Sequence, residues 1–143
     1  MKRFNSAKII GLISVILCLV TASDTLAEQK MFAAAQQVFE AYRVDVSSVD
    51  MNIEQRDNSE IFVLHVKARR NNFDMALMLG FMAAGTAVQK SNNTGVTGVR
   101  VIVEVPYKET LFVEASSTIG NVKKLVNGET KPEEFMRKYV IFT

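Results

Sequence analysis

Hydrophobic residues recur along the chain with two different periods, and the changes of period divide residues 28–143 into six consecutive elements. A spacing of three and four residues predicts a first helix from Glu28 to Arg43, with an apolar stripe of Phe32, Ala35, Phe39 and Tyr42. The elements that follow are a β-hairpin, a central helix, a second β-hairpin and two short helices.

The first hairpin is predicted over residues 49–68, where apolar and polar residues alternate. With Asn58 and Ser59 as a two-residue turn, Ile53 pairs with Leu64, and most apolar positions of both strands share one face. A slip of one residue would move these positions to solvent, so the pattern fixes which face of each strand is buried.

The central helix is predicted from Asn71 to Lys90 and is the least polar part of the chain. Its 14 residues from Met75 to Val88 carry no charge. At a rise of about 1.5 Å per residue they span roughly 20 Å, which is too short to cross a membrane. The sequence therefore indicates a buried helix that other elements must surround.

Two sets of residues on this helix are candidate sites. Small residues allow another backbone to approach closely, and the neighbour is either the rest of the same chain or a second copy in a homodimer; these residues are Ala76, Gly80, Ala83 and Ala87. Three methionines either fill the core or line, together with the sheet, a cavity for a small apolar ligand; these are Met75, Met78 and Met82.

The second hairpin is predicted over residues 99–117 with a loop at residues 107–109. The valines of its first strand then face Leu111, Val113 and Ala115, whereas Arg100 and Glu114 lie diagonally on the other face.

The C-terminal part is predicted to form two short helices. Ser117 or Thr118 caps the first, which Asn127 and Gly128 end. The second helix has Pro132 in its first turn and runs to Tyr139, with Thr130 and Glu133 at the spacing of a capping box. The apolar tail, residues 140–142, is expected to dock as an extended segment.

These elements predict one α+β domain over residues 28–143, with a four-stranded antiparallel sheet packed on the central helix. On the outer face of that sheet, four apolar residues interrupt polar neighbours: Ile61, Val63, Ile102 and Phe112. Either the first helix lies across them, which is the simpler interpretation, or they form a partner-binding patch.

Residues 1–27 have the pattern of a cleavable signal peptide, with a basic start, an uncharged apolar run and a small-x-small site ending at Ala27. The alternative is an uncleaved membrane anchor, which needs a longer apolar run. Cleavage would remove Cys18, the only cysteine, so we expect an exported chain in a bacterial periplasm without disulfides or thiolate chemistry.

Cleavage would also leave 14 of the 17 Lys and Arg residues and 14 of the 15 Asp and Glu residues. A formally neutral chain with only short basic doublets is not expected to bind nucleic acid, because such binding needs clustered positive charge. No membrane span is expected after cleavage.

No motif in the chain indicates a particular catalytic reaction. His65, the only histidine, falls on the polar face of the first hairpin beside Asn52, without a nearby nucleophile. Carboxylates do not cluster at metal-ligand spacing, so neither a metal nor a cofactor is predicted. We therefore expect a non-enzymatic accessory or interaction module with a protein partner, the alternative being a carrier of a small apolar ligand. A hydrolase that uses His65 with carboxylates of the outer face is a third, weaker hypothesis.

Overall fold

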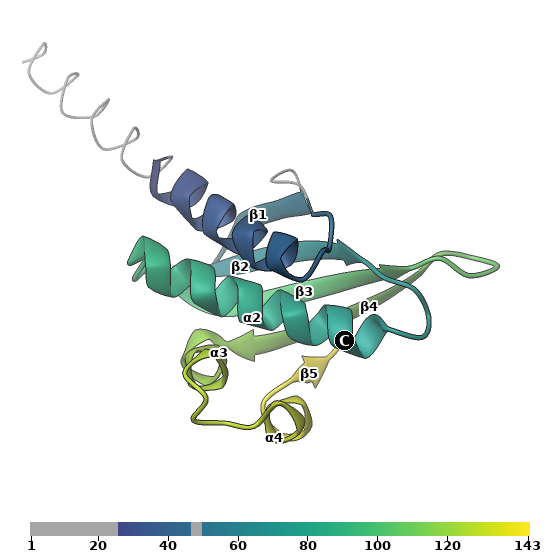
Figure 1. Cartoon of the computed structure of the whole chain (residues 1–143). Coiled ribbons are helices and arrows are strands. Elements are labelled where there is room, and N and C mark those ends of the chain that lie inside the picture. Colours follow the sequence, from purple (N-terminus) through teal and green to yellow (C-terminus); the bar gives the residue numbers. More distant parts are fainter. Residues whose placement is uncertain (1–25, 47–49) are drawn as a thin grey trace, which may run out of the picture.

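The fold is seen in a computed structural model, which describes residues 26–46 and 50–143. It is α+β, with a mixed five-stranded sheet and the described helices on one of its faces (Figure 1). In chain order the elements are α1 (residues 26–41), β1 (Met51–Arg56), β2 (Ser59–Lys67), α2 (Phe73–Ser91), β3 (Val96–Val105), β4 (Leu111–Thr118), α3 (Ile119–Val126), α4 (Pro132–Lys138) and β5 (Ile141–Phe142). Most of the predicted signal peptide lies outside the described residues.

The sheet has the strand order β1-β2-β3-β4-β5, with β2 and β3 parallel and the other neighbours antiparallel. The prediction of four antiparallel strands is therefore wrong. Helix α2 connects β2 to β3 and returns the chain to the end of the sheet where β2 began, so β3 runs in the same direction as β2. The fifth strand comes from the C-terminal tail, whose docking as an extended segment is confirmed.

The first hairpin turns at Asp57 and Asn58, which have positive φ angles of 47° and 64°. The predicted register is wrong by two residues, because Ile53 pairs with Phe62 instead of Leu64. Two successive positive φ angles favour Asp and Asn over Ser, and this places the turn one residue earlier than predicted. A shift of two residues leaves every side chain on its predicted face.

The second hairpin has the predicted register, with Val101 opposite Ala115 and Val103 opposite Val113. Thr118 caps α3, since its side-chain oxygen accepts a hydrogen bond from the backbone N–H of Asn121. The predicted capping box of the last helix is wrong: the N-cap of α4 is Lys131, which makes no side-chain capping bond.

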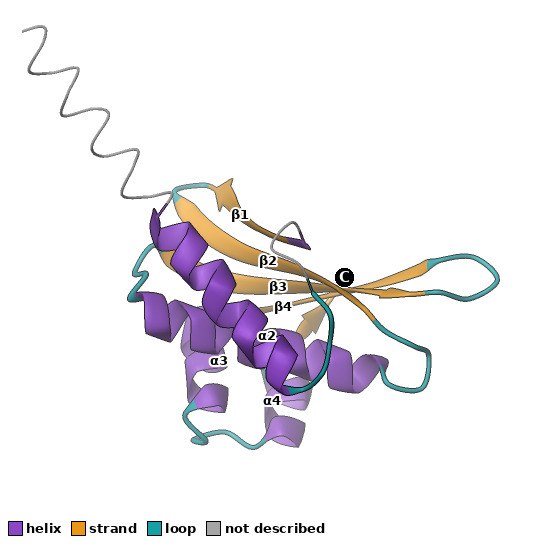
Figure 2. Ribbon diagram, turned by 45° about the horizontal axis from the view of Figure 1, so that its top comes forward, coloured by secondary structure: helices purple, strands orange, loops and turns teal. Residues whose placement is uncertain are grey.

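Helix α1 packs on the same face of the sheet as α2, as Figure 2 shows. The ring of Phe32 stacks on Phe62 of β2, with centroids 5.7 Å apart and planes at 16°. Of the predicted stripe, Ala35 and Phe39 are fully buried, whereas Tyr42 lies beyond the helix end and is 59% exposed. The interpretation that the first helix crosses the outer face is therefore wrong.

Helix α2 packs on β2 and β3, with α3 beside it on the same face of the sheet, and it is the centre of the core. Gly80 faces β3 so closely that a Cβ atom there would lie 2.5 Å from Cγ1 of Val101. Phe81 meets Phe135 of α4 edge to face, with centroids 5.3 Å apart. This contact fixes α4 and thereby the segment that leads into β5.

Candidate functional site

The outer face, defined as the sheet face opposite α1 and α2, carries no described helix. All four residues of the predicted patch point to it. Phe112 is 64% exposed, Ile61 and Ile102 are half-buried, and Val63 is fully buried and adds no accessible surface. Of the predicted patch, three apolar side chains are therefore accessible on the outer face.

An ion-pair network crosses the middle of the outer face. Arg100 of β3 contacts Glu54 of β1 through Nη2, and its Nη1 donates to Oε1 of Glu114 on β4 at 3.1 Å. Arg56 joins the same Glu54, with Nε 3.6 Å from Oε2. Only 13% of the Arg100 side chain is exposed, so its alkyl stem and guanidinium lie against the sheet. The predicted diagonal pair of Arg100 and Glu114 is confirmed, but its connection to β1 required the three-dimensional arrangement.

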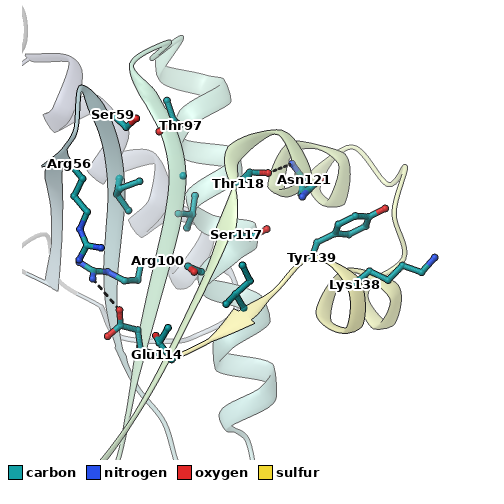
Figure 3. A pocket seen from close by; sticks show the side chains of 16 residues that line it. Arg56, Ser59, Thr97, Arg100, Glu114, Ser117, Thr118, Asn121, Lys138 and Tyr139 are labelled. Carbon is teal, nitrogen blue, oxygen red and sulfur yellow. Dashed lines mark hydrogen bonds and ion pairs between the residues drawn. The ribbon is translucent and has the colours of Figure 1, made fainter.

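A cleft of about 560 Å³ adjoins this network where β4 passes into α3. Figure 3 shows Arg56 on one side of the cleft, Lys138 and Tyr139 on the other, and Ser117 and Thr118 between them. Its further lining consists of hydroxyl, amide and apolar side chains together with Gly98: Ser59, Thr97, Ser116, Asn121, Thr143, Ile61, Val99 and Ile141, besides Arg100 and Glu114.

The C-terminal wall of the cleft is held by local interactions. Lys138 donates to Oε1 of Glu134 at 2.7 Å. This side-chain hydrogen bond, reinforced by the opposite charge, lowers the pKa of Glu134 and raises the pKa of Lys138. Behind this pair, Phe135 is fully buried against α2. The wall therefore depends on α4 packing on α2.

Sequence reasoning did not find the cleft, because its walls come from segments far apart in the chain. Arg56 and Tyr139 line the same cleft only because β5 folds back along β4. The apolar tail after α4 was the one sequence feature that pointed to this arrangement. It predicted that the tail docks on the domain, but it did not predict that the tail pairs with β4.

The three candidate methionines gather on the opposite, helical side of the molecule. Met75, Met78 and Met82 line a groove of about 220 Å³ with Tyr42 and Val44 from the segment after α1. Met75 is 64% exposed, and the other two are half-buried. The groove is open to solvent, and the residue of the sheet that lines it is Lys67 at the end of β2.

The candidate small-residue face of α2 is buried within the chain. Ala83 and Ala87 are fully buried, and the close neighbour of Gly80 is Val101 of the same chain. Ala76 is 7% exposed. A homodimer would therefore have to use another surface.

His65 is exposed on the outer face, as the predicted face of β2 requires, and lines a shallow hollow with Asp45, Lys67 and Glu104. Among the described residues, no three His, Cys, Asp or Glu side chains are placed to hold a metal ion. Within the same residues, no helix has the length and apolar character needed to span a membrane.

Comparison of the chain with protein-family models, with curated proteins and with solved structures finds no significant match.

Proposed function

We propose that this protein is an exported, non-enzymatic interaction module that binds a partner protein through the outer face of its sheet. The observation that supports this most is that α1 packs beside α2 and leaves the outer face open. Phe112 stands exposed there, and Ile61 and Ile102 lie beside polar groups. Aromatic side chains surrounded by polar rims are typical of binding hot spots. Export to a bacterial periplasm belongs to the same proposal and is supported by the pattern of residues 1–27.

We expect Phe112→Glu to weaken partner binding about thirtyfold or more, because a hot-spot aromatic contributes roughly 2 kcal/mol or more. The melting temperature should stay close to that of the wild type, since Phe112 is 64% exposed and exposed substitutions usually change stability by about 0.5 kcal/mol or less. The measurement is affinity capture from the native envelope with wild type and variant in parallel, followed by titration of the captured partner.

Met75→Glu is the matched control, because Met75 is also 64% exposed but lies on the helical side. It should bind the partner like the wild type. If both variants bind equally well, or if only Met75→Glu loses the partner, the outer face is not the binding surface.

A second candidate function, a carrier of a small apolar ligand, is favoured by the one groove that brings Met75, Met78 and Met82 together. Its volume of about 220 Å³ is below the roughly 300 to 1,000 Å³ of typical ligand pockets. The interaction module therefore remains the preferred function. A co-purified apolar molecule that Met75→Glu removes would favour the carrier.

A further inference from the structure

The cleft beside β4 has the dimensions of a ligand site; its lining does not include Phe112 but shares Ile61 with the predicted patch. Its volume of about 560 Å³ falls within the roughly 300 to 1,000 Å³ typical of small-molecule pockets. Its two walls, Arg56 and Tyr139, come from the first strand and from the segment after α4 (Figure 3). A ligand here would contact the end of β1 and the C-terminal segment, which lie far apart in the sequence.

The charges of the cleft are already neutralised by the protein itself. Arg56 and Arg100 share Glu54, and Arg100 also binds Glu114. Lys138 is hydrogen-bonded to Glu134. An anionic ligand would have to compete with these carboxylates for every cation, so the cleft favours an uncharged ligand over an anion.

Neutral hydrogen-bonding groups remain available between the charged ones. The side-chain amide of Asn121 and the hydroxyl of Ser116 line the cleft, and both residues are half-buried. Ser117 is 7% exposed, and its buried Oγ has no hydrogen-bond partner in the described part of the chain. Ser117 pairs with the buried Val99 on the core face of the sheet, so its hydroxyl does not add to the groups that the cleft offers a ligand.

We propose that this cleft binds a neutral saccharide. Sugar hydroxyls are donors and acceptors at once, as are the serine and threonine hydroxyls and the Asn121 amide of the lining. The half-buried ring of Tyr139 and the side chain of Ile141 offer apolar surface for the C–H face of a sugar ring. The arginines and carboxylates beside the cleft are already paired with one another, so their charges do not require a charged ligand.

The test is a titration of the ¹⁵N-labelled protein with three probes: an N-acetylglucosamine trimer, maltotriose and inorganic phosphate. We expect at least one trisaccharide to shift the amide signals of Gly98, Ser116 and Asn121 in a saturable manner below about 10 mM, the range of weak millimolar affinity. Ser116→Leu, which fills the cleft, should weaken that binding at least tenfold, and Asn121→Ala should weaken it measurably.

Phe112→Glu is the control and should bind the trisaccharide like the wild type, because Phe112 is not part of the cleft lining. This control also separates the two proposals, since the same variant is expected to lose the protein partner. The saccharide site is refuted if neither trisaccharide shifts these signals, if only phosphate does, or if binding to folded Ser116→Leu is unchanged.

Discussion

Gly80→Leu is expected to lower the free energy of unfolding by about 2 kcal/mol, without changing the mass of the protein in solution. A Cβ atom at position 80 would lie 2.5 Å from Cγ1 of Val101, which is itself fully buried on the central strand β3. Overpacking of this kind costs roughly 1 to 3 kcal/mol and occasionally more. The better helix propensity of Leu recovers up to about 1 kcal/mol of that cost. Chemical denaturation measures the loss, and light scattering measures the mass.

Gly120→Ala is the matched control for a helical glycine. Nothing lies within 4 Å of a Cβ atom placed at Gly120, so helix propensity alone acts there and should stabilise the protein by about 0.5 to 1 kcal/mol. If Gly80→Leu instead converts a dimer into a stable monomer, the neighbour of Gly80 belongs to a second copy, and the packing of α2 on β3 is wrong.

Arg100→Met is expected to destabilise the protein by about 2 kcal/mol. The substitution keeps a long apolar side chain but leaves Glu54 and Glu114 on the sheet without their shared cation. Removing one partner of a buried pair costs roughly 3 to 5 kcal/mol. Because each carboxylate side chain is about one third exposed, water compensates part of that loss. Urea denaturation at neutral pH measures the effect.

Two further variants isolate the ion network. Arg56→Met removes an arginine that is 63% exposed and makes one contact of 3.6 Å, so it should change stability by about 0.5 kcal/mol or less. Adding Glu54→Gln and Glu114→Gln to Arg100→Met should recover part of the lost stability, because no carboxylate is then left without a cation. If Arg100→Met and Arg56→Met lower the free energy of unfolding equally, the ion pairs of Arg100 do not stabilise the protein more than the exposed contact of Arg56 does.

The strands and their faces could be predicted because a period of two assigns each residue to one side of a sheet. For this reason Ile53 and Phe62 were placed on the core face even though the turn was predicted one residue late. The register of the second hairpin could also be predicted, because the alternation together with the loop at residues 107–109 pairs Val101 with Ala115 and Val103 with Val113. The start of its first strand could not, since β3 begins at Val96 and not at Val99.

The parallel pairing of β2 with β3 was missed, although a long helix between two strands is the pattern that predicts it. Both hairpins alternate locally in the same way whichever strands meet, so periodicity does not determine the order of strands. The cleft was missed for a related reason. Arg56, Asn121 and Tyr139 have no common spacing in the sequence, and only the docking of β5 on β4 brings them together.

The open outer face is tested most directly by cysteine labelling. In a Cys18→Ser background, Ile102→Cys and Val103→Cys place one thiol on each side of β3, at a half-buried and a fully buried position. The cysteine at position 102 should react with a maleimide at least about tenfold faster, because labelling at position 103 requires opening of the core. Equal protection of both thiols in the folded protein would contradict an outer face that is free of helices.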